Sequence, residues 1–159
     1  MLKRSFRRLV VPLVLAGVAS LPATAAAQTL SVRVDGTPEL SGKVLITVPV
    51  TASCSPFEPP QLFFGVSVTV SIEQATKGAI AHGSAFANLS STDPCDGADH
   101  TVLVNVLADS SGPPFKRGNA AFSVSMEAES GQECFPGGPP FCNIQEAFTS
   151  APPVVLKVK

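Results

Sequence analysis

The chain of 159 residues contains no tryptophan, no tyrosine and only two histidines, His82 and His100. Histidine is the side chain best suited to acid–base catalysis near neutral pH, so its scarcity limits the enzymatic chemistry available. The sequence also lacks the Gly-x-Ser-x-Gly motif of hydrolases, a phosphate-binding glycine loop and the HExxH motif of zinc proteases. A triad of His100, an aspartate and a serine can be drawn, but no motif supports it. We therefore predict that the protein is not an enzyme.

Long hydrophobic runs are also absent. The apolar run from Leu9 to Ala19 is shorter than the roughly 20 residues that a membrane-spanning helix needs, and no later run is longer. Four cations precede it and Ala25-Ala26-Ala27 follows it, which is the pattern of a secretory signal peptide. We predict cleavage after Ala27, no membrane span, and a secreted single domain over residues 28–159.

Clustered positive charge is missing from the predicted mature chain. The signal peptide removes four of the 11 basic residues and none of the 12 acidic ones, which leaves a formal net charge of −5. Nucleic acids require clustered lysine and arginine, so the charge argues against a nucleic-acid partner.

Strict alternation of apolar and polar residues, typical of a half-buried β-strand, recurs along residues 28–159. The apolar members of four segments are predicted to face inward: Val44, Ile46, Val48, Val50 and Ala52; Phe64, Val66, Val68, Val70 and Ile72; Val102, Val104 and Val106; Ala120, Phe122, Val124, Met126 and Ala128. The polar members between them, including Thr47, Thr51 and Ser53, are predicted to face water.

Three further segments complete a set of seven strands: Leu30 to Val34, Ile80 to Leu89, and Ile144 to Lys159, which Pro152-Pro153 interrupts. Short strands separated by turn-forming residues, without helical periodicity, predict an all-β fold, an antiparallel sandwich of two sheets. Pro49 lies inside the second strand, and because proline cannot donate to a ladder, we expect an edge or a bulge there.

The four cysteines, Cys54, Cys95, Cys134 and Cys142, all lie beyond the predicted signal peptide, and an even number in an exported chain predicts disulfides. If the strands alternate in direction, the connections after the second, fourth and sixth strands lie at one end of the sandwich. Every cysteine falls at that end. Of the three possible pairings, this favours Cys54 with Cys95 and Cys134 with Cys142.

Proline and phenylalanine gather at the same end. Phe57, Pro59 and Pro60 lie in one connection, and Phe135, Pro139, Pro140 and Phe141 lie in another. Loops stiffened by proline and a disulfide lose little entropy on binding, and exposed aromatic residues often anchor interfaces. These residues are therefore a candidate binding surface for an extracellular protein. The alternative is that the phenylalanines fold back and plug the open end of the core.

Three carboxylates, Asp93, Asp96 and Asp99, are spaced by three residues and could supply oxygen ligands to calcium. The segment lacks the ligand order of an EF-hand, and Asp, Pro and Gly are common in turns, so a turn is the default interpretation. No other cofactor is predicted.

The number and spacing of the strands resemble an immunoglobulin-like sandwich over residues 28–159. The tryptophan and tyrosine typical of antibody domains cannot be present, so the resemblance concerns architecture alone. The Cys134 to Cys142 spacing ahead of the last strand also resembles the neocarzinostatin-type apoproteins, and this resemblance implies a carrier of a small apolar ligand.

The leading functional hypothesis is a secreted, non-enzymatic binding module that uses the loops at the cysteine end. Besides the carrier, two alternatives remain open. The loop between Cys134 and Cys142 could be the protease-binding loop of an inhibitor, or the protein could be a passive structural component of a cell envelope.

Overall fold

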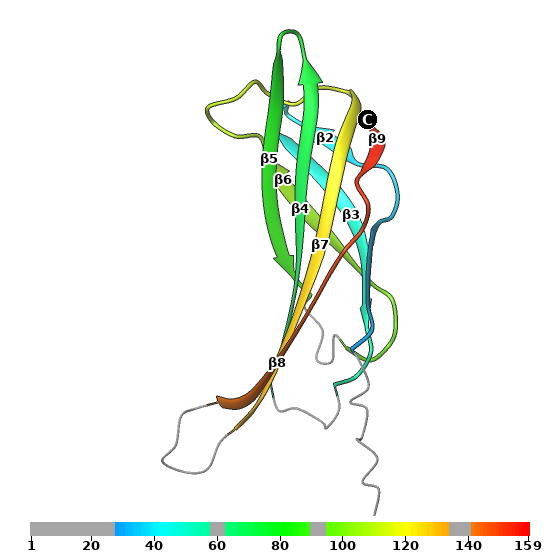
Figure 1. Cartoon of the computed structure of the whole chain (residues 1–159). Coiled ribbons are helices and arrows are strands. Elements are labelled where there is room, and N and C mark those ends of the chain that lie inside the picture. The colour runs from blue at the N-terminus through cyan, green and yellow to red at the C-terminus, as the bar shows by residue number, and fades with distance from the viewer. Residues whose placement is uncertain (1–27, 58–62, 90–94, 134–140) are drawn as a thin grey trace, which may run out of the picture.

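The structure, a computed structural model, describes residues 28–57, 63–89, 95–133 and 141–159 (Figure 1). The predicted signal peptide lies outside these residues. Within them the chain is all-β, and we find no helix that could serve as a membrane span. Nine strands are present: β1 Leu30–Val34, β2 Glu39–Ser41, β3 Leu45–Cys54, β4 Phe63–Thr76, β5 Ala79–Asn88, β6 His100–Leu107, β7 Gly118–Glu133, β8 Phe141–Ser150 and β9 Val154–Val158.

The strands form two antiparallel sheets, one behind the other in Figure 1. In the first sheet, β3 pairs with β6 on one side, and with β1 and then β2 on the other. In the second sheet the order is β5-β4-β7, and both β8 and β9 pair along the remaining side of β7. Each sheet therefore has one outer edge made of two short strands in place of one long strand.

The core lies between the sheets and contains the alternating residues that the sequence predicted. From the first sheet, Ile46, Val48, Val50, Ala52, Val104 and Val106 are buried. From the second, Val66, Val68, Val70, Ile72, Ala120, Phe122, Val124, Met126 and Ala128 are buried. The two-residue period of a strand therefore identified the inward face of both central strands of the second sheet.

Two predicted orientations are wrong. Val44 is 49% exposed, because it belongs to the turn that precedes β3 and not to the strand. Thr51 is 2% exposed although it lies on the polar face, because Asp35 and Thr101 cover it. The Thr51 hydroxyl donates a hydrogen bond to the Asp35 carboxylate and lies within hydrogen-bond distance of the Thr101 hydroxyl. The prediction of seven strands also missed β2 and merged β8 with β9, which Pro152 and Pro153 separate.

Pro49 lies in a central strand, so of the two settings predicted for it, an edge or a bulge, the sheet edge is wrong. The Pro49 carbonyl accepts a hydrogen bond from the Asp35 N–H at 2.9 Å. The nitrogen and carbonyl of one strand residue point to the same side, so the Pro49 nitrogen also faces the segment between the end of β1 and the start of β2. The missing N–H therefore costs no ladder hydrogen bond. Gly36 lies in this interruption with φ at 111°, and a side chain there would come within 3.1 Å of the Pro49 ring.

Candidate functional site

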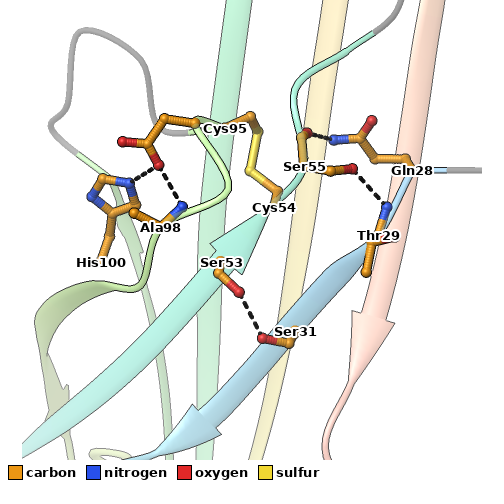
Figure 2. The surroundings of a disulfide bond; sticks show 10 residues. Gln28, Thr29, Ser31, Ser53, Cys54, Ser55, Cys95, Ala98 and His100 are labelled. Atoms are coloured by element: carbon orange, nitrogen blue, oxygen red, sulfur yellow. Dashed lines mark hydrogen bonds and ion pairs between the residues drawn. A yellow bond between two sulfur atoms is a disulfide. The ribbon is translucent and has the colours of Figure 1, made fainter.

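The predicted Cys54–Cys95 disulfide is present and joins the end of β3 to the connection between β5 and β6 (Figure 2). The described ends of β3, β5 and β7 lie at the same end of the molecule, as the alternation of strand directions predicted (Figure 1). Both cysteines are 1% exposed. The bond therefore anchors the segment Cys95 to His100, which we call the Cys95 loop, to the core.

Hydrogen bonds fix the Cys95 loop further. The Gly97 N–H donates to the Cys54 carbonyl at 2.9 Å, with Gly97 at a φ of 84° that favours glycine. Asp96 Oδ1 accepts from the Ala98 N–H at 2.7 Å and lies 2.9 Å from His100 Nε2. These two contacts, that from Ala98 first, lower the pKa of Asp96. The loop is thus a closed turn, and residues 96 to 99 are exposed on it.

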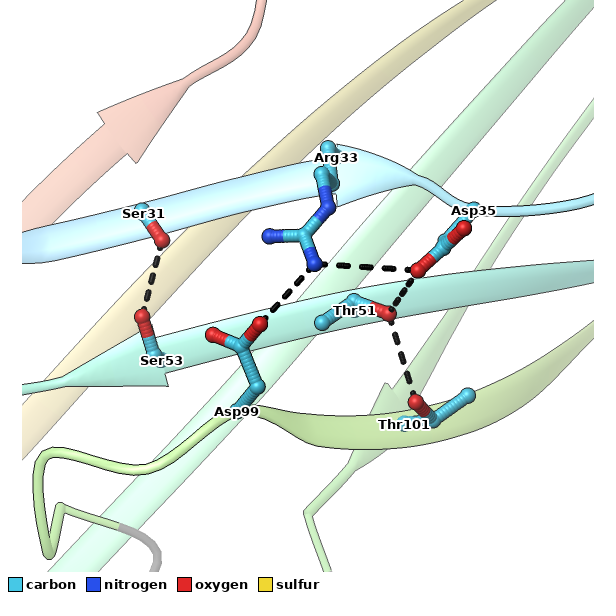
Figure 3. A network of polar contacts seen from close by, with 7 residues as sticks. All are labelled: Ser31, Arg33, Asp35, Thr51, Ser53, Asp99 and Thr101. Atoms are coloured by element: carbon cyan, nitrogen blue, oxygen red, sulfur yellow. Dashed lines mark hydrogen bonds and ion pairs between the residues drawn. The ribbon is translucent and has the colours of Figure 1, made fainter.

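An exposed ionic network flanks the Cys95 loop (Figure 3). Arg33 of β1 donates a hydrogen bond to Asp99 Oδ2 at 2.9 Å and lies 3.7 Å from Asp35. The Thr51 hydroxyl donates to Asp35 at 3.0 Å and lies 3.2 Å from the Thr101 hydroxyl. The hydrogen bond from Arg33 lowers the pKa of Asp99. Four segments are therefore joined in one polar surface on the outer face of the first sheet.

The first described residues bind to the segment that follows Cys54. The Thr29 N–H donates to Ser55 Oγ at 3.0 Å, and the Ser55 N–H donates to the Thr29 carbonyl at 2.9 Å. Gln28 Nε2 donates to the Ser55 carbonyl, and the hydroxyls of Ser31 and Ser53 lie 2.8 Å apart (Figure 2). The chain on both sides of the disulfide is therefore held by side-chain and backbone contacts.

The predicted aromatic surface is described only in part. Phe57 is 4% exposed and packs into the core, which is the arrangement that the core-plug interpretation predicts. Pro59, Pro60, Cys134, Phe135, Pro139 and Pro140 lie outside the described residues. Phe141 and Cys142 begin β8, and their side chains are also outside the described part, as is the loop of the inhibitor hypothesis.

The predicted calcium ligands have other partners where they are described. Asp96 is bound to Ala98 and His100, and Asp99 is bound to Arg33, whereas Asp93 lies outside the described residues. In the part of the chain that the structure describes, no group of three or more acidic, histidine or cysteine side chains could hold a metal ion. The geometry therefore adds no support to a calcium site.

A surface pocket of about 570 Å³ lies at the opposite end of the molecule, and no sequence pattern predicted it. It is lined by Leu40, Gly42, Lys43, Pro114, Phe115, Lys116 and Arg117. These residues come from β2, from the β2–β3 turn and from the segment before β7. The pair Lys116-Arg117 after Pro113-Pro114-Phe115 is a visible sequence signal, but its proximity to Lys43 depends on the fold.

No family model, curated protein or solved structure matches this chain.

Proposed function

We propose that the protein is a secreted, non-enzymatic binding module on an immunoglobulin-like sandwich, and that the Cys95 loop with its flanking network recognises an extracellular protein. One observation carries this proposal: the loop is fixed at its base by the Cys54–Cys95 disulfide and along its length by hydrogen bonds from Gly97, Ala98 and His100. A loop fixed before binding loses less conformational entropy when a partner binds it.

The chemistry of the surface supports a polar, charge-dependent contact. Asp96, Asp99, Arg33 and Asp35 are all exposed there, and carboxylates and a guanidinium lie within one network. Charged groups at the rim of an interface mainly set the association rate and its salt dependence. We therefore expect association to slow as the salt concentration rises.

Loops on a rigid scaffold frequently carry binding functions. The Cys95 loop lies on such a scaffold, at one end of the two sheets. The histidine–carboxylate pair of His100 and Asp96 does not by itself argue for catalysis, because among the described residues the side-chain hydrogen bond of the His100 imidazole is to Asp96. An enzyme of the hydrolase type would need a nucleophile beside that imidazole.

The test is capture of partners from native secreted and cell-surface material with three forms of the protein. Ala98→Arg places a large cation on the exposed tip of the loop and leaves the Ala98 N–H free to bind Asp96. Ala79→Arg is the matched control, since Ala79 is also exposed but lies at the β4–β5 turn, at the other end of the sandwich.

We expect the wild-type protein and Ala79→Arg to hold the same partner, and Ala98→Arg to lose it without a change in melting temperature. Equal capture by all three forms would place the binding surface elsewhere. Capture by none of them would favour the passive structural role.

A further inference from the structure

We propose that the pocket at the end opposite the disulfide binds a small amphiphile with one anionic head group and an apolar body. This site is separate from the Cys95 loop, because it precedes β3 and β7, whereas Cys54 ends β3. Its volume of about 570 Å³ is within the range of small-molecule sites, which is about 300–1,000 Å³.

The pocket combines an apolar interior with a cationic rim. Leu40 and Pro114 supply apolar surface above the fully buried Phe115, and Lys43, Lys116 and Arg117 supply three positive charges, while no acidic residue lines the pocket. Among the described residues the ion pairs involve Arg33, His82 and His100, so these three cations have no carboxylate partner there. In a chain whose predicted mature charge is negative, this local excess of cations is complementary to an anion.

One wall of the pocket is held in place from within the core. The buried side chain of Gln74 donates to the Lys116 carbonyl at 2.7 Å and accepts from the Lys116 N–H at 2.7 Å. Phe115 is fully buried next to Gly83, where a methyl group would come within 2.9 Å of its ring. The backbone that carries Lys116 and Arg117 is therefore fixed, and their exposed side chains are available to a ligand.

The opposite wall carries a conformational irregularity. Lys43 has a φ of 67°, and it is the one non-glycine residue with positive φ among those described. This backbone conformation disfavours an L side chain, so glycine would suit the position better than lysine. A cation kept in an unfavourable conformation at the rim of a pocket is consistent with a role in binding. Leu40 on the same wall is held by its N–H, which donates to the Lys159 carbonyl at 2.9 Å.

The test is isothermal titration calorimetry of the protein with probes that have the same dodecyl chain and differ in their head group. The protein is recovered from the exported fraction after expression of the full chain, and each probe stays below its micelle concentration. Calorimetry is suitable because the chain has no tryptophan or tyrosine to report binding by fluorescence. The probes are dodecanoate, dodecanol and dodecyltrimethylammonium, and acetate and inorganic phosphate represent the head group alone.

We expect saturable one-to-one binding of dodecanoate, and at least about 10-fold weaker binding of dodecanol, since hydrogen bonds to charged groups contribute on that scale. Dodecyltrimethylammonium, acetate and phosphate should show no saturable binding. Equal binding of the three dodecyl probes would overturn the proposal and leave only non-specific apolar adsorption. Binding of acetate or phosphate as tight as that of dodecanoate would also overturn it, because the body would then contribute nothing.

Two variants locate the site. Lys116→Gln/Arg117→Gln should weaken dodecanoate binding at least about 10-fold, whereas Lys77→Gln/Lys157→Gln, with the same change of charge outside the pocket lining, should leave it unchanged. Lys43→Gly should bind dodecanoate more weakly while its melting temperature stays the same or rises. Unchanged affinity in the Lys116/Arg117 variant, or in Lys43→Gly, would contradict the proposal. Neither variant alters the Cys95 loop, so a failure here is distinguishable from a failure of partner binding.

Discussion

Gly83 in β5 shows how one residue without a side chain allows two elements to pack. A Cβ atom at this position would lie 2.3 Å from the Leu107 carbonyl oxygen and 2.9 Å from the Phe115 ring. The backbone of β6 and the buried phenylalanine therefore occupy the space that any other residue would need.

We expect Gly83→Ala to lower the free energy of unfolding by about 2 kcal/mol or more, because the added methyl group meets backbone and cannot be accommodated by a side-chain rotation. Gly112→Ala is the control, since its nearest contact would be an ordinary 3.7 Å from the Asp109 carbonyl oxygen. Urea denaturation of both variants measures the difference. Equal midpoints for the two would show that β5 and β6 do not approach as described.

The ion pair of Arg33 and Asp99 predicts a small pH dependence of stability. The hydrogen bond from Arg33 lowers the pKa of Asp99 in the folded state. A depressed folded-state pKa stabilises the fold above the unfolded-state pKa of about 3.9, and this contribution is lost as the pH falls through the folded-state value. The pair is exposed, so the effect should be small and should diminish in salt.

Substitution of Arg33 tests this assignment. In Arg33→Gln the pKa of Asp99 should rise toward its ordinary value, as measured by NMR titration of the side-chain carboxyl carbon. The variant should melt below the wild type at neutral pH, and the difference should shrink in acid. Identical Asp99 titration curves in the two proteins would contradict the Arg33–Asp99 contact.

Local alternation identified most buried residues of the strands, because the side chains of a strand alternate whatever its partner is. It failed at Thr51, whose burial depends on Asp35 and on Thr101, 50 residues further along the chain. It also failed at Val44, where the turn ends and the strand has not started. Both errors arise because a two-residue alternation reports neither contacts with distant residues nor the residue at which a strand begins.

At the scale of elements, the connection from β5 to β6 is tied to β3 by the Cys54–Cys95 disulfide. The two cysteines are separated by 41 residues, and closing a loop of this length lowers the entropy of the unfolded chain by an amount equivalent to about 4 kcal/mol. The sequence predicted this bond because strand directions alternate. It could not predict the hydrogen bonds that close the turn around Gly97.

We expect the Cys54→Ala/Cys95→Ala variant to lose about 2–4 kcal/mol of unfolding free energy, the lower end allowing for residual structure in the unfolded chain. Urea denaturation under oxidising conditions gives the value. A midpoint equal to that of the wild type would mean that the bond does not constrain the unfolded chain.

Gln74 joins β4 to the segment that precedes β7. Its amide makes two hydrogen bonds with the backbone of Lys116 and a longer one, 3.4 Å, to the Asn119 carbonyl, and it is 2% exposed. Gln74 lies near the C-terminal end of β4, and its sequence position gave no indication of which backbone its side chain would contact.

Replacement of Gln74 by methionine keeps the length of the side chain and removes these hydrogen bonds. We expect Gln74→Met to cost about 1–3 kcal/mol, because the Lys116 N–H and carbonyl lose their partner. Thr76→Val, which removes the exposed hydrogen bond to the Ala79 carbonyl, should cost less than about 0.5 kcal/mol. Thermal melts of both variants measure the difference, and a harmless Gln74→Met would show that the contact does not hold the segment.

At the scale of the whole molecule, the two ends of the sandwich differ in chemistry. The disulfide end presents carboxylates around a fixed loop, and the opposite end presents three cations around an apolar pocket. The sequence predicted the all-β fold, the two antiparallel sheets and the end at which Cys54 and Cys95 lie. It did not predict the pocket, because Lys43 and Arg117 are brought together only when the β2–β3 turn reaches the start of β7.

We propose above that the Cys95 loop contacts an extracellular partner. The most direct measurement is photo-crosslinking in native secreted material with a photoreactive residue at Ala98, compared with the same residue at Ala79. We predict a crosslinked partner from position 98 that is absent from position 79 and is lost when the Cys54–Cys95 disulfide is removed. Crosslinks that are equal from both positions, or that survive removal of the disulfide unchanged, would contradict the account.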